Sequence, residues 1–163
     1  MRRTFALIAA VVFVAAGQTA AGDTPEEACF RTTINYERTR LGIPELKPNA
    51  AVQQVARAHS AEMASRDTIY HDPNLAEELP PFQYAGENVG MGASCDQLHQ
   101  AFMNSPGHRA NILDRDFTDL GVGVSIKDDT LFVTEDFFRP AVIARPPPSS
   151  PRPRPRGSAP CGR

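Results

Sequence analysis

The sequence lacks the short motifs that mark the common hydrolases and nucleotide-binding enzymes. It has no HExxH zinc-protease motif, no GxSxG nucleophile motif and no Walker A loop. Each of these motifs sets reacting groups at a fixed spacing on a helix or a sharp turn. A His-x-x-x-His pair, which would bring two metal ligands to one helix face, is also missing. The sequence motifs therefore do not identify the protein as a zinc protease of this type, a serine hydrolase with this nucleophile motif or a Walker A nucleotide-binding enzyme.

Cysteine is scarce, with only Cys29, Cys95 and Cys161 among 163 residues. None of them directly follows the N-terminal apolar run, which argues against a lipoprotein. Cys29 and Cys95 fall at predicted helix starts, whereas Cys161 lies near the C-terminus in a segment that should not fold. We predict a Cys29–Cys95 disulfide, which would close a long loop and constrain the unfolded chain. Two buried thiols are the alternative.

One long apolar run is present, and it lies at the N-terminus. Arg2 and Arg3 precede an apolar stretch over 5–16, and small residues follow it up to Gly22. This layout is typical of a secretory signal peptide, and the run is too short to span a bilayer comfortably. We therefore expect a signal peptide over 1–22, a secreted mature protein and no transmembrane segment after cleavage. An uncleaved N-terminal anchor is the alternative.

Charge is divided unevenly along the chain. Residues 23–139 hold all 19 acidic residues and 10 basic ones, a formal charge of −9. Such an acidic domain argues against nucleic acid as a partner, because the phosphate backbone favours cations. Residues 140–163 hold five arginines, no acid and eight prolines. We predict a disordered tail there, solvated rather than bound to an anionic wall polymer or membrane.

The remaining pattern predicts an α+β domain over 23–139. Thr24 and Glu27 form a capping box, and apolar residues at helical spacing continue to Gly42. Alternating residues around 120–126 and 131–138 predict a β-hairpin. One face of its first strand carries Gly121 and Gly123, which have no side chains, so a helix could pack closely against that face. The other expected elements are helices over 49–66 and 95–103, an irregular loop over 67–83, a short strand over 85–89, and one helical turn over 108–113 after a break at Pro106-Gly107. This order favours a small antiparallel sheet covered by helices.

Several polar residues lie in predicted loops or at the ends of elements, where functional sites usually lie. They are His71, Glu87, His108 and Glu135. Two histidines with one or two carboxylates suit an open divalent-metal site, or an acid and a base without a metal. His59 lies on the apolar stripe of the second helix, so we interpret it as a core histidine bonded to a neighbour.

Together, "HSAEMASRDTIYHDPNL", "GENVG", "FMNSPGHRANIL", "DLGVGV" and "LFVTEDF" resemble the CAP superfamily of cysteine-rich secretory, antigen 5 and pathogenesis-related proteins, in its short bacterial form. The resemblance covers about residues 30–138. It implies an α-β-α sandwich with a small antiparallel sheet between helical layers. It also implies a surface cleft with two histidines and two acids, which in some members binds zinc or another divalent ion.

Matching the motifs assigns the cleft residues of the family to particular positions in this sequence. His71 and His108 match the two histidines and Glu87 matches the acid of the "GEN" motif, so these three are the candidate metal ligands. Ser105 stands where a glutamate is expected, which removes one ligand. Glu135 is added as a residue that could approach from the return strand. The alternative is structural, with Glu87 and His108 bonding the backbone and fixing their turns.

These expectations favour a secreted, monomeric binding module without catalytic residues. Its cleft would bind a small molecule, a lipid or a cell-wall component. No cofactor is required, and a divalent cation such as zinc is the candidate metal. Two alternatives stay open: a metal-dependent or serine-type hydrolase using Ser105 beside His108, and a wall-associated structural protein tethered by the basic tail.

Overall fold

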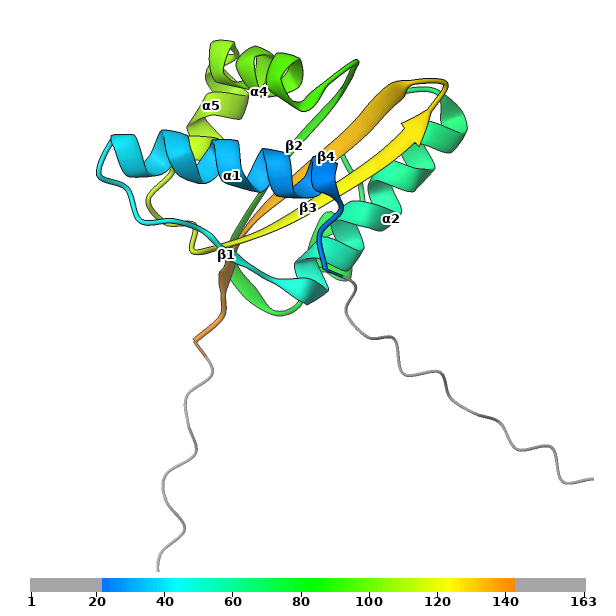
Figure 1. The fold of residues 1–163 in the computed structure, drawn as a ribbon. Coiled ribbons are helices and arrows are strands. Elements are labelled where there is room, and N and C mark those ends of the chain that lie inside the picture. Colours follow the sequence, from blue (N-terminus) through cyan, green and yellow to red (C-terminus); the bar gives the residue numbers. More distant parts are fainter. Residues whose placement is uncertain (1–21, 143–163) are drawn as a thin grey trace, which may run out of the picture.

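A four-stranded sheet runs through the centre of residues 22–142, the part of the chain that the computed structural model describes (Figure 1). Most of the predicted signal peptide and of the predicted tail lie outside these residues. The elements are α1 (Pro25–Arg40), β1 (Lys47–Pro48), α2 (Ala50–Arg66), α3 (Leu75–Glu78), β2 (Phe82–Gly92), α4 (Cys95–Asn104), α5 (Pro106–Leu113), β3 (Asp119–Lys127) and β4 (Thr130–Pro140).

The strands lie in the order β1-β3-β4-β2, so β2 is an edge strand. β4 pairs antiparallel with both β2 and β3, whereas the two-residue β1 pairs parallel with β3. The predicted hairpin is confirmed: β3 and β4 are joined through Asp128 and Asp129, both with positive φ (47° and 60°). Positive φ at both turn residues matches the right-handed twist of the strands.

Helices cover both faces of the sheet. Helix α2 packs on the face that carries Gly121 and Gly123, and α1, α4 and α5 lie on the other face. A Cβ atom on Gly121 would lie 2.4 Å from the Gln53 nitrogen, and one on Gly123 would lie 2.2 Å from the Ala56 carbonyl. The glycine face therefore admits the helix backbone itself. The predicted α+β sandwich, with a mainly antiparallel sheet between helical layers, is confirmed.

The main core lies between the sheet and the layer made by α1, α4 and α5. It contains residues from every element of that layer and from β3 and β4, among them Phe30, Leu98, Ile112, Val122 and Phe137. At its rim the Cys29–Cys95 disulfide joins α1 to α4, with a Cα–Cα distance of 6.4 Å. The predicted disulfide is thus confirmed.

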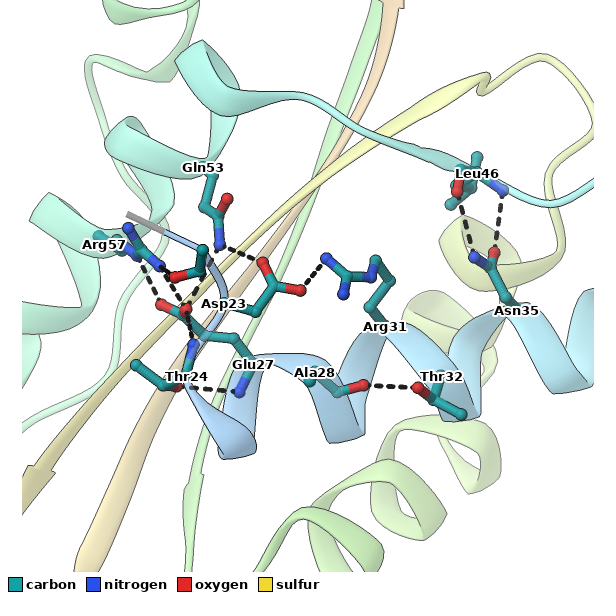
Figure 2. Close-up of polar contacts among 11 residues, drawn as sticks. Asp23, Thr24, Glu27, Ala28, Arg31, Thr32, Asn35, Leu46, Gln53 and Arg57 are labelled. Carbon is teal, nitrogen blue, oxygen red and sulfur yellow. Dashed lines mark hydrogen bonds and ion pairs between the residues drawn. The ribbon is translucent and has the colours of Figure 1, made fainter. Parts of the chain in front are cut away.

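The start of α1 is held by a buried polar network, shown in Figure 2. The predicted capping box is confirmed, since Glu27 accepts from the Thr24 nitrogen (2.8 Å) and Thr24 accepts from the Glu27 nitrogen (3.2 Å). Arg57 on α2 donates to both carboxylate oxygens of Glu27, at 2.7 and 2.6 Å. Burial raises the pKa of Glu27, but the bonds from Arg57 and Thr24 outweigh it and lower the pKa overall. A buried carboxylate therefore joins the two helical layers.

A second buried charge fixes the loop that leads to β3. Arg38, near the end of α1, is 1% exposed. It donates to the carbonyls of Pro44 (2.9 Å), Ile112 (3.0 Å), Asp114 (2.7 Å) and Phe117 (3.2 Å). Buried carbonyls need such partners, so one guanidinium positions the end of α5 and the segment behind it.

Three local predictions need correction. The segment 67–83 is not wholly irregular, because it contains α3 and the first residues of β2. The short strand expected over 85–89 extends over Phe82–Gly92, because β4 pairs with it along most of that length. Pro106 does not simply end a helix: it stands in the first turn of α5, where its fixed φ fits and its missing N–H is not needed.

Candidate functional site

Glu87 is the centre of the candidate site. It lies in the middle of the edge strand β2, where alternation directs Glu87 and Val89 towards the α2 face and Gly86 and Asn88 towards the other. Its side chain is 4% exposed. A buried carboxylate requires hydrogen-bond donors, and the structure supplies them from the segment that follows α2.

His71 is the main donor to Glu87. Its Nδ1 lies 2.6 Å from Glu87 Oε1, while 66% of the His71 side chain is exposed. The Asp72 backbone nitrogen donates to the same oxygen at 3.0 Å. Because Nδ1 is taken by the carboxylate, Nε2 is the ring nitrogen left for a ligand. Glu87 thus orients His71.

His59 supports this arrangement from α2. Its Nε2 lies 2.7 Å from the Tyr70 carbonyl and 3.8 Å from Glu87 Oε2, and its ring packs edge-on against Tyr70. The predicted role as a bonded core histidine is confirmed. The sequence pattern did not show that His59 also borders the Glu87 carboxylate. A pocket of about 230 Å³, lined by His59, Tyr70 and Asp72 among others, adjoins these residues.

His108 belongs to the first turn of α5, on the other side of β2. Asn88 donates to the His108 carbonyl (3.2 Å), and Asn111 donates to the Asn88 side chain (2.9 Å) and to the Glu87 carbonyl (3.2 Å). The His108 ring lies 4.9 Å from that of Phe102. Two asparagines therefore fix α5 against the strand that carries Glu87.

His108 is affected by burial and by the charge of His71. Burial lowers the pKa of His108, and the charge of His71 lowers it further. A lowered pKa favours the neutral imidazole, which is the form that ligates a metal. The two histidines lie on opposite faces of the edge strand: His71 bonds Glu87 on one face, and the His108 carbonyl accepts from Asn88 on the other.

The other two predicted cleft residues lie apart from the His71–Glu87 pair. Ser105 is half-buried at the junction of α4 and α5, and within residues 22–142 no hydrogen bond joins it to His108. Glu135 is fully buried on the face opposite Glu87, where Asn88 donates to its Oε2 at 3.0 Å. Burial raises the pKa of Glu135 to about 8, although the Asn88 bond lowers it.

A further buried carboxyl, which the sequence did not indicate, lies beside the site. Asp136 on β4 is directly opposite Glu87 on β2, and neither of its oxygens has a hydrogen-bond partner. Burial, and then the charge of Glu87, raise its pKa to about 8. The strand register alone creates this pair, because residues directly opposite in a sheet share a face.

The three candidate metal ligands do not converge on one point. Within residues 22–142, the one set of at least three ligand atoms all within 4.8 Å of one another is that of Cys29, Cys95 and Asp96. A metal at the predicted site would therefore bind to one or both histidines. Glu87 would not be a ligand, because its carboxylate bonds His71 Nδ1.

Comparison with known proteins gives the family context of this site. The model of the cysteine-rich secretory protein family (CAP) matches residues 32–137. The uncharacterised protein YkwD of Bacillus subtilis is 35% identical over 100 residues, which are 55% of this chain and 38% of YkwD. The chain therefore spans well under half of that curated relative's length.

Two solved structures extend the comparison. An extracellular protein containing an SCP domain from Bacillus anthracis has a TM-score of 0.64 and 31% identity, over 73% of this chain and 45% of that one. An outer surface protein from Borrelia burgdorferi has a TM-score of 0.66 and 19% identity, over 73% of this chain and 96% of that one. By their names both are extracellular or surface proteins. Within residues 22–142, none of the helices is both long and apolar enough to cross a bilayer.

Proposed function

This chain belongs to the cysteine-rich secretory protein (CAP) family, and we propose that it is a secreted, non-enzymatic binding protein whose ligand contacts His71 and His108 at the β2 edge of the sheet. A zinc-like divalent cation is the ligand that these donors suit best. The predicted signal peptide and the extracellular or surface names of the fold neighbours support the location.

One observation carries the proposal: the 2.6 Å contact between His71 Nδ1 and the buried Glu87 carboxylate. Histidines that bind metals commonly donate their second ring nitrogen to a carboxylate, which fixes the tautomer and directs the other nitrogen to the metal. His71 shows this arrangement, with a well exposed ring. In this proposal Glu87 orients a ligand and does not itself bind the metal.

The charge of the domain supports a cationic ligand. Residues 23–139 carry a formal charge of −9, which raises the local concentration of cations. The lowered pKa of His108 favours its neutral imidazole, which is the form that ligates a metal. Both conditions favour metal binding over recognition of an anion.

The arrangement also supports binding rather than hydrolysis. A serine–histidine mechanism needs the histidine bonded to the serine and oriented by an acid. Within the described residues Glu87 bonds His71, on the far side of β2 from Ser105 and His108. The serine-type alternative therefore lacks its orienting contact in this structure.

The proposal is tested by titrating zinc into the oxidised full-length chain and measuring the heat of binding by calorimetry. No reductant is present. We expect the wild type to bind zinc and the His71→Ala/His108→Ala variant to lose that binding. Glu87→Gln should weaken it by about ten- to a hundredfold, the usual effect of losing an orienting carboxylate. Glu77→Gln, an exposed carboxylate on α3, is the matched control and should bind like wild type.

Two results would contradict the proposal. Zinc binding that is unchanged in the double-histidine variant, with its helical circular dichroism intact, would remove this site from consideration. Turnover of casein or ester substrates that disappears in Ser105→Ala would show that the protein is an enzyme.

A further inference from the structure

The disulfide region contains a second group of metal-ligand atoms, which includes neither His71 nor His108. Atoms of Cys29, Cys95 and Asp96 all lie within 4.8 Å of one another. Cys29 is in the second turn of α1, and Cys95 and Asp96 are the first two residues of α4. The disulfide occupies both sulfurs, so the group becomes a ligand set only when that bond is reduced.

Solvent can reach this disulfide. A surface pocket of about 340 Å³ is lined by both cysteines, and its remaining lining residues are Pro25, Glu26, Ala93, Ser94, Asp96 and Leu131. Two of these residues are carboxylates and none is basic, so the pocket attracts cations. A small dithiol therefore has a path to the sulfurs, and a metal ion has a path to the reduced site.

Each of the two helices that carry the cysteines is anchored in the core by side chains other than the cysteines. On α1 the neighbouring Phe30 is fully buried, and on α4 Leu98 is 6% exposed, and both belong to the main core. A Cα–Cα distance of 6.4 Å separates the cysteines. Two thiolates on a tetrahedral zinc lie about 3.8 Å apart, given zinc–sulfur bonds of about 2.3 Å. Small rotations of the two cysteine side chains would bring the sulfurs to this separation without a movement of the helices.

Cys95 is also well placed to carry negative charge. It is the first residue of α4, and Ser94 caps that helix by accepting from the Gln97 nitrogen at 3.3 Å. The free N–H groups and dipole of a helix N-terminus stabilise an anion there. Asp96 adds a carboxylate ligand in the same turn.

We propose that Cys29, Cys95 and Asp96 form a redox-gated binding site for a thiophilic divalent cation of the zinc class, closed by the disulfide and opened by a dithiol reductant. In the opening step two electrons and two protons pass from the dithiol to the disulfide. The cystine becomes two thiols, and the reductant becomes its own disulfide. Metal binding then releases the two thiol protons to solvent. Three protein ligands leave a fourth position for water, as in open zinc sites.

Cobalt binding tests this site separately from the histidine site. The full-length chain with Cys161→Ser and His71→Ala/His108→Ala is reduced with dithiothreitol and freed of it anaerobically. It is then titrated with Co²⁺. We expect a sulfur-to-cobalt charge-transfer band in the near ultraviolet for the reduced chain and none for the oxidised chain. Adding Cys95→Ser should abolish the two-thiolate spectrum.

The carboxylate ligand has a matched control in the same pocket. Asp96→Asn should weaken Co²⁺ affinity by at least about tenfold. Glu26→Gln removes a charge of the same sign but no member of the ligand set, and should have a smaller effect. Circular dichroism of the reduced, metal-free chain reports whether the domain is still folded.

Three results would overturn the proposal. They are a reduced chain without the charge-transfer band, equal affinities for Asp96→Asn and Glu26→Gln, and a reduced chain that loses its helical signal and does not regain it with metal. Because this variant lacks His71 and His108, a failure here would not contradict the proposed function at the β2 edge.

Discussion

Gly123 on β3 lies directly against the backbone of Ala56 on α2, so that a Cβ atom on the glycine would stand 2.2 Å from the Ala56 carbonyl. No flexible side chain intervenes, and relief requires the whole helix to shift. The distance from α2 to the sheet therefore depends on the absence of one methyl group. The same helix carries His59, whose Nε2 lies 3.8 Å from Glu87 Oε2, so a shift of α2 would also move His59.

The first prediction concerns this contact. Gly123→Ala should lower the free energy of unfolding by about 3 kcal/mol, because overpacking against rigid backbone is poorly relieved. Urea denaturation followed by circular dichroism measures the change. Gly107→Ala is the control, since nothing lies within 4 Å of its added Cβ, and it should be neutral or stabilising. Equal stabilities of the two variants would show that α2 moves freely.

The second prediction concerns the buried guanidinium of Arg38. Arg38→Met should cost at least about 2 kcal/mol, because four carbonyls lose their donor and two of these bonds, to Ile112 and Phe117, are buried. Thermal and urea unfolding measure the loss. Arg40→Met removes a more exposed arginine paired with Glu37, and should change stability by no more than about 1 kcal/mol. A similar small cost for Arg38→Met would mean that water replaces the guanidinium.

The third prediction concerns the Cys29–Cys95 disulfide. Reduction should lower the free energy of unfolding by about 2–4 kcal/mol without abolishing the fold. The loop that the bond closes is long, with a sequence separation of 66, and the core around Phe30 and Leu98 stays packed. Urea unfolding with and without dithiothreitol provides the measurement in the Cys161→Ser background. A reduced chain as stable as the oxidised one would contradict it.

The fourth prediction concerns pH. Burial raises the pKa of Glu135 and Asp136 to about 8, above their ordinary values of 4.5 and 3.8. The native state therefore keeps protons that the unfolded chain releases. The contribution of these two carboxyls to the free energy of unfolding should therefore fall as pH rises from about 4.5 to about 8 and then level off.

Urea unfolding at a series of pH values measures this dependence. Glu135→Gln/Asp136→Asn should remove this contribution between about pH 4.5 and 8, because neither amide titrates. Glu77→Gln, which changes an exposed carboxylate, should keep the wild-type slope. A wild-type profile that falls no more than that of the double variant over this interval would show that the two carboxyls are ionised in the native state.

Much of the fold was predictable from local sequence, because its determinants lie within a few residues of one another. The Thr24–Glu27 capping box marks the start of α1, and alternation over 120–126 marks β3. The 67–83 segment was harder to predict. The start of β2 has no alternation of its own there, and its pairing with the distant β4 makes it a strand.

The candidate site was predictable in its members but not in their roles. The motifs around His71, Glu87 and His108 identified all three residues as candidate metal ligands. The structure separates them, because Glu87 is buried and bonds His71, while His108 approaches from the opposite helical layer. Asp136 was missed because only strand register places it opposite Glu87.

The sequence by itself determined the helix starts, the hairpin and the glycine face that accepts α2, and it favoured the Cys29–Cys95 pairing that the structure shows. Each of these follows from backbone preferences, periodicity or the small number of cysteines, which are properties of the chain before it folds. Only the tertiary structure decided that Glu87 orients His71, that Arg38 bonds carbonyls up to 79 positions away, and that Cys29 meets Asp96. Those relations depend on how distant elements pack, and packing is a property of the whole domain.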